Sequence, residues 1–140
     1  MEANRATDPE YGYTAHLTGV AFDDARARTI EALKQQGFGV LTEIDVKSTL
    51  KAKLGCEFRR YVIFGACNPQ LAHRALDADL GIGLLLPCNV CVWEEEGGSV
   101  VSIARPEAMF AIVNRDDVLP VAQEADRRLR RALEQIESAG

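Results

Sequence analysis

Two Cys-Asn dipeptides are the residues of this chain whose types and spacing could do chemistry. Each stands beside a proline, in Cys67-Asn68-Pro69 and in Pro87-Cys88-Asn89. A thiol can act as a nucleophile, and a carboxamide both donates and accepts hydrogen bonds. Because a packed core rarely needs such a pair, its repetition predicts one composite site built from two loops. The predicted ligand-binding residues are Cys67, Asn68, Cys88 and Asn89.

Cys67 is the candidate catalytic residue, because it directly precedes a predicted helix. Asn68 can cap that helix, and Pro69 fits its first turn. The free amides and the dipole of a helix N-terminus stabilise a thiolate, which predicts a lowered pKa for the Cys67 thiol. The same amides can hold a small anion, so the predicted ligand is small and anionic or sulfur-containing. The competing interpretation, that both cysteines are small buried hydrophobic residues, stays open.

Secondary candidates lie in two other segments. Glu43 and Asp45 share one face of a predicted strand, as paired catalytic carboxylates do, and Lys47 follows them. The alternative is that Asp45 caps the next helix while its neighbours lie in solvent. His73 falls in the second turn of the helix that starts after Asn68, where it could serve as a base near Cys67.

The Cys88-Asn89-Val90-Cys91 run has the spacing of a zinc or redox pair, but its setting argues against both. Residues three apart in a strand face opposite ways, and a redox pair belongs at a helix start. Only His16 and His73 could add histidine ligands. No metal and no cofactor are therefore predicted.

Composition excludes several function classes. The chain has 140 residues and a net charge of −5, which argues against a nucleic-acid binder. The longest apolar run, Ile82–Cys88, is too short to span a membrane. The N-terminal residues carry no apolar signal core, so we expect a cytoplasmic protein whose four cysteines are free thiols.

The order of the predicted elements is β-α-β-α-β-α-β-β-α-α, which indicates a single compact α+β domain with a mixed or antiparallel sheet covered by helices. Residues 1–9 are expected to form a flexible N-terminus, and residues 10–140 the domain. The segment 82–95 is predicted as one long strand interrupted at Pro87. Gly97-Gly98 predicts a hairpin into a strand over 99–104. Apolar spacing predicts a long amphipathic C-terminal helix at about 118–138.

Four segments in this order resemble the domain-of-unknown-function 302 family. The segments are 38–47, 53–55, Gly65-Ala66-Cys67-Asn68-Pro69, and 81–90, which reads Gly-Ile-Gly-Leu-Leu-Leu-Pro-Cys-Asn-Val. The resemblance covers about residues 11–113 and implies a small stand-alone α+β domain, known in bacteria and archaea, with no assigned reaction. The C-terminal helix and Cys91 lie outside the pattern that carries it.

The residues leave a second functional class open. The chain could be a non-enzymatic interaction module whose Cys-Asn segments only brace the core. The predicted hairpin strand 99–104 risks leaving a sheet edge uncovered, so we expect a homodimer that buries an edge or the face of the last helix. Whether the protein is an enzyme is undecided at this level.

Overall fold

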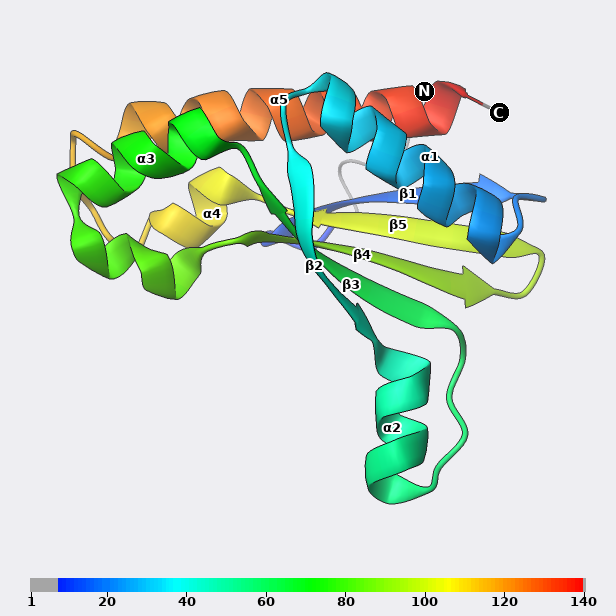
Figure 1. Cartoon of the computed structure of the whole chain (residues 1–140). Helices are drawn as coiled ribbons and strands as arrows, with labels where there is room; N and C mark the ends of the chain where they lie inside the picture. The colour runs from blue at the N-terminus through cyan, green and yellow to red at the C-terminus, as the bar shows by residue number, and fades with distance from the viewer. Residues whose placement is uncertain (1–7, 140) are drawn as a thin grey trace.

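An antiparallel sheet of five strands, in the order β1-β5-β4-β3-β2, forms the centre of the molecule (Figure 1). The computed structural model describes residues 8–139, so most of the predicted flexible segment 1–9 lies outside the described residues. The β-branched and aromatic residues of these segments favour extended backbone. The strands are β1 (Gly12–Thr18), β2 (Gly39–Asp45), β3 (Tyr61–Cys67), β4 (Cys88–Glu95) and β5 (Gly98–Ala104).

Helices cover one face of this sheet (Figure 1). They are α1 (Phe22–Gln35), α3 (Pro69–Ala78), α4 (Pro106–Phe110) and α5 (Leu119–Ser138). By contrast, α2 (Val46–Leu54) projects away from the sheet on the other side. No helix within residues 8–139 combines the length and the apolar character needed to cross a membrane.

The core lies between the sheet and the helix layer. Strand alternation turns Phe64, Val90 and Ile103 to the same face, where register places them side by side and none is exposed. The apolar stripe of α5 packs on β1 and β5 and adds Leu129, Leu133 and Ile136 to this core, all fully buried. Burying each such side chain contributes about 1.5–3 kcal/mol, so this face sets the position of every element that packs on it.

A buried polar contact fixes α5 against β1. The Tyr13 hydroxyl donates to Oδ1 of Asp126 at 2.7 Å, and Arg130 donates to the same hydroxyl at 2.6 Å. Asp126 is only 1% exposed, and its second oxygen accepts from the Glu107 amide at 3.4 Å. Because a buried carboxylate is costly unless hydrogen-bonded, these donors account for its place in the core.

The single α+β domain and its element order are confirmed, but two local predictions are wrong. Residues 80–85 form a short 3₁₀ helix, η2 (Leu80–Leu85), and the strand begins only at Cys88. Asp79 Oδ1 accepts from the Gly81 amide at 2.9 Å and starts that turn, so the segment before Pro87 is not extended. In addition, β5 lies inside the sheet, and its edges are β1 and β2.

The face of the sheet opposite the helix layer is called the open face here. It carries Tyr61 and Ile63 of β3, and Cys91 and Trp93 of β4, all half-buried. The residues of β2 are exposed or half-buried along its whole length. Within residues 8–139, the helix layer therefore packs against the side chains of one face only and leaves the open face without helices.

Candidate functional site

The antiparallel ladder between β3 and β4 brings the two Cys-Asn segments to the same end of the sheet. Cys67 is the last residue of β3 and Cys88 the first of β4, and Cys88 pairs with Ala66. Cys67, Asn68 and Cys88 line one inner pocket, whose remaining walls come from the core. Its other lining residues are Phe38, Ala66, Leu71, Ala72, Ala75, Leu86, Phe110, Val121 and Ala125.

The inner pocket is nearly filled. Its free volume is about 20 Å³, which is the space of roughly one water molecule. Apart from Asn68 and the two thiols, its lining side chains are apolar. In this conformation the pocket is therefore too small for a ligand.

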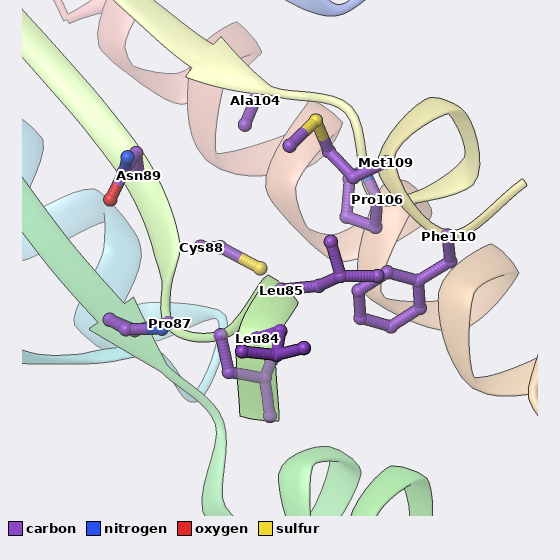
Figure 2. A pocket seen from close by; sticks show the side chains of 10 residues that line it. Leu84, Leu85, Pro87, Cys88, Asn89, Ala104, Pro106, Met109 and Phe110 are labelled. Atoms are coloured by element: carbon purple, nitrogen blue, oxygen red, sulfur yellow. The ribbon is translucent and has the colours of Figure 1, made fainter. Parts of the chain in front are cut away.

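A larger outer cavity lies on the other side of Cys88 (Figure 2). Its free volume is about 200 Å³. Leu86, Cys88 and Phe110 line both spaces, so these three residues form the wall between them. In Figure 2 the Cys88 sulfur points toward Leu85. The outer cavity is lined by Leu84, Leu85, Leu86, Pro87, Cys88, Asn89, Ala104, Pro106, Met109 and Phe110.

The two asparagines are placed differently from the cysteines. Asn68 is buried, and its Oδ1 accepts from the Leu71 amide at 3.1 Å, which confirms it as the cap of α3. Asn89 is exposed and pairs with Gly65. In Figure 2 its side chain points away from the Cys88 sulfur, because consecutive strand residues face opposite ways. Asn89 therefore contributes to the rim of the outer cavity.

Burial decides the protonation of the two pocket thiols. Burial, together with a smaller contribution from the charge of the nearby Cys67 thiolate, raises the pKa of Cys88 to about 11. Burial also raises the pKa of Cys67. The lowered pKa expected for Cys67 at the helix N-terminus is therefore wrong in direction. Desolvation exceeds the effect of the dipole, and one amide of that terminus is already bound by Asn68.

The other two cysteines lie elsewhere. Cys91 is on the open face, opposite Ile63 and next to Tyr61, while Cys88 faces the core. Burial raises the pKa of Cys91 and of Tyr61 as well. Cys56 is exposed in the connection that follows α2. The Cys88–Cys91 spacing thus forms no dithiol, as the strand argument predicted.

The secondary candidates do not join this site. Glu43, Asp45 and Lys47 lie at the opposite end of the β2–β3 ladder, where they line a polar cavity of about 280 Å³. Asp45 Oδ1 accepts from the Ser48 amide at 3.0 Å, so Asp45 caps α2, and this bond lowers its pKa. His73 is exposed on α3 and lines neither the inner pocket nor the outer cavity.

Sequence reasoning missed several residues at both ends. Arg26 and Arg60 complete the polar cavity: Arg26 Nε donates to Glu43 Oε2 at 2.9 Å, and Arg60 Nη2 to Asp23 Oδ1 at 2.7 Å. At the cysteine end, Met109 and Phe110 of α4 form part of the outer wall. Pro106 is a sequence signal for the start of α4, but no sequence feature near it indicates that this helix lies close to the start of β4.

Comparison with known proteins adds a family to this geometry. Residues 13–136 match the family described as "Domain of unknown function DUF302". The chain belongs to the DUF302 family. The match extends through most of α5, so this helix, which the sequence resemblance left out, is part of the family domain.

A solved structure gives the same fold. The crystal structure of an uncharacterized conserved DUF302 protein from Bacillus stearothermophilus superimposes with a TM-score of 0.82 at 31% sequence identity. The similarity covers 91% of this chain and 98% of the other. No curated protein matches this chain. The comparisons therefore establish family and fold, and the reaction or ligand has to be argued from the site.

Proposed function

We propose that this DUF302 protein binds a small, uncharged and largely apolar molecule in the outer cavity at the start of β4. The observation that supports this proposal is the cavity itself, about 200 Å³ in volume and bounded mainly by apolar side chains. Small-molecule sites are concave and mostly apolar, with a few polar groups at defined places. Here those groups are the Cys88 thiol and, at the rim, the Asn89 carboxamide.

The size and the sulfur atoms favour an aromatic ligand. A cavity of about 150 Å³ lined by Leu, Ile and Phe is large enough to bind benzene, so the outer cavity suits a ring with one small substituent. Cys88, Met109 and Phe110 offer two polarisable sulfurs and one ring face. Sulfur atoms make favourable contacts with aromatic edges. A sulfur-containing molecule of similar size meets the same surface.

The charge of the lining favours a neutral ligand over the anionic alternative. Neither the outer cavity nor the inner pocket has a Lys or Arg side chain among its described lining residues. Because burial keeps both pocket thiols protonated at neutral pH, the proposal is binding and not attack by a thiolate. All four cysteines are free thiols, which supports the cytoplasm as the proposed location.

The composite site of the two Cys-Asn segments then has two parts. Cys88 separates them, and Cys67 with Asn68 lines the inner part. Leu86 and Phe110 also line both spaces, so a rotamer change at either residue is the simplest way to join them. At about 20 Å³, the inner pocket would extend the outer cavity by roughly the size of a methyl group, while Asn89 meets any polar group at the rim.

Binding is tested by titrating the ¹⁵N-labelled protein with benzene and following amide chemical shifts. We expect saturable shifts at residues 84–89 and 104–110. The Ala104→Leu variant fills the cavity and should remove these shifts, whereas Ala111→Leu, on the same α4 region but outside the cavity lining, should retain them. Shifts that do not saturate, or that survive Ala104→Leu, would show that the cavity is not the site.

A second candidate function is a self-associating interaction module, in which the Cys-Asn segments are structural. The half-buried aromatic residues of the open face and the exposed strand β2 favour it. We propose a homodimer on these grounds. Sedimentation equilibrium of the intact chain tests it against the 15.3 kDa monomer mass.

A further inference from the structure

The segment from β2 to the start of β3 joins the sheet through the pairing of β2 with β3, but the helix that it carries is poorly covered by the rest of the described chain. This segment, here called the arm, comprises β2, α2 and the connection 55–60. α2 has no buried residue, and Leu54 is 72% exposed. Leu41 of β2 is 67% exposed. The arm therefore presents apolar side chains that the core does not cover.

The stripe on α2 has the pattern of a helix that packs against something. Val46, Leu50 and Leu54 recur every four residues, which places them on one face. A nine-residue helix is marginal in water, because such helices draw most of their stability from packing an apolar face. The Asp45 cap and the Gly55 stop define the ends of α2, but they do not bury its stripe.

The open face of the sheet lies beside the arm. Figure 1 shows that α2 projects on the side opposite the helix layer, so the arm and the open face belong to the same side of the molecule. Aromatic residues line this surface: Tyr61 stacks on Trp93 with ring centroids 5.2 Å apart, and Phe58 is 6.2 Å from Tyr61. Such amphipathic rings are enriched at protein interfaces.

The charges around this surface come in two complementary patches. α2 carries Lys47, Lys51 and Lys53 and no acidic residue, in a chain whose net charge is −5. The end of β4 and its turn carry Glu94, Glu95 and Glu96, which line a shallow groove with the 57–59 segment. Within one chain, Lys47 and Lys51 pair with Glu57, and Glu95 contacts His16, all at the surface. One molecule therefore presents both a basic helix and an acidic groove, and association exchanges these exposed contacts for contacts with the partner subunit.

We infer that two copies of the chain associate through a two-fold axis at this surface, with α2 of each lying across the open face of the other. This inference rests on the self-association proposed above and names its interface. In a two-fold interface the same patch serves both subunits, so a surface that holds both partners of each contact is what such a dimer requires. Leu50 and Leu54 meet the partner subunit's Tyr61 and Trp93, and the lysines meet the partner's Glu95 and Glu96.

The apolar contact is tested by sedimentation equilibrium on the full chain over a range of concentrations. The wild-type protein should approach twice 15.3 kDa as concentration rises. Leu54→Glu should weaken the dimer about tenfold or more, the effect of removing a central apolar contact. Leu80→Glu is the matched control, because Leu80 is 86% exposed on η2, away from the arm. It should leave the association unchanged.

Charge reversal tests the orientation and does not depend on the leucine variant. K51E/K53E and E95K/E96K should each be monomeric, because like charges then face one another. Mixing the two variants should restore a dimer, because each interface half again pairs opposite charges. Circular dichroism of each variant verifies that the helix content is retained.

The outcomes separate this inference from the proposal beneath it. A wild-type dimer that persists in Leu54→Glu and in both charge-reversed variants would overturn the arm interface and leave self-association standing. A wild-type monomer at millimolar concentration would overturn both, and would assign the surface to a different protein. Failure of the mixed variants to associate would overturn the crossed arrangement of α2 on the partner's acidic groove.

Discussion

The two ends of the β2–β3 ladder hold the two groups of polar residues in this protein that look most like sites. At one end, Cys67 and Cys88 lie under α3 and α5, and burial keeps their thiols protonated. At the other, Glu43 and Asp45 stand beside Arg26 and Arg60 in solvent. The ends are built by the same strands, but helices bury the thiols of the first, whereas the first turns of α1 flank the second and leave its charged side chains exposed.

This difference shows what covering does to chemistry. The exposed charged side chains of the polar cavity form pairs. Each of its carboxylates accepts a hydrogen bond from an arginine or a backbone amide, so local pairing accounts for these residues without a ligand. Burial removes water from the thiols at the covered end and raises the pKa of Cys88. The same end also holds the outer cavity, a space that the core side chains do not fill. This contrast is why we propose ligand binding at the covered end and a structural role for the charged end.

The largest expected contrast is in thiol reactivity. Cys56 is exposed and should react first with a disulfide reagent at neutral pH. With a pKa of about 11, Cys88 has roughly a hundredfold less thiolate than a thiol of ordinary pKa near 9. Cys56→Ser should therefore remove the fast phase of the reaction, measured by stopped-flow absorbance. A fast phase that instead disappears in Cys67→Ser would restore the original expectation for Cys67.

A glycine pair on the same ladder probes the packing beside the cavity. A Cβ added at Gly65 would lie 2.7 Å from Pro87 Cγ and clash with Thr42, whereas one at Gly39 meets nothing within 4 Å. Because the proline ring is rigid, Gly65→Ala should lower the free energy of unfolding by about 1–3 kcal/mol. Gly39→Ala should stay within about 0.5 kcal/mol of wild type. Urea denaturation measures both, and equal effects would contradict the packing described here.

Alkaline pH should destabilise the covered end. Burial raises the pKa of Cys88 in the folded state from about 9 to about 11, so the unfolded chain releases its proton first as pH rises. The free energy of unfolding should therefore decline between pH 9 and 11. Cys88→Ala should make this decline shallower, while Cys56→Ala should leave it unchanged. An identical slope in all three proteins would show that Cys88 is not desolvated.

The smallest effect belongs to the charged end. Arg26 and Glu43 form a two-pronged but partly exposed ion pair. A double-mutant cycle with Arg26→Met and Glu43→Gln should give a coupling energy of about 0.5 kcal/mol. Salt should reduce it further, because exposed pairs are screened. A coupling of several kcal/mol would mean that this end is as desolvated as the cysteine end.

Local signals predicted the features that local physics decides. Asn68 caps α3 and Asp45 caps α2, because each side chain accepts a hydrogen bond from the backbone amide three residues later. The Gly97-Gly98 turn joins β4 to β5 as expected, with Gly97 at a φ of 82°. Apolar periodicity located α5 to within one residue at its start.

Features set by distant contacts were not predictable in the same way. The interior position of β5 depends on its pairing with β1, eighty or more residues away. Met109 and Phe110 reach the cavity only because α4 folds back beside β4. The pKa of Cys67 has the opposite direction to the one expected, because desolvation depends on what covers a residue and not on its neighbours in sequence. The spacing of the Cys-Asn segments was informative about proximity but not about charge state.

The central claim is that the outer cavity at Cys88 receives a small apolar molecule. A crystal structure of the protein soaked with bromobenzene tests it most directly, because the bromine gives an anomalous peak of its own. We predict that the peak lies inside the outer cavity, between Leu85 and the side chains of Met109 and Phe110. A peak found only on the open face, or no peak within the cavity, would contradict the proposed function.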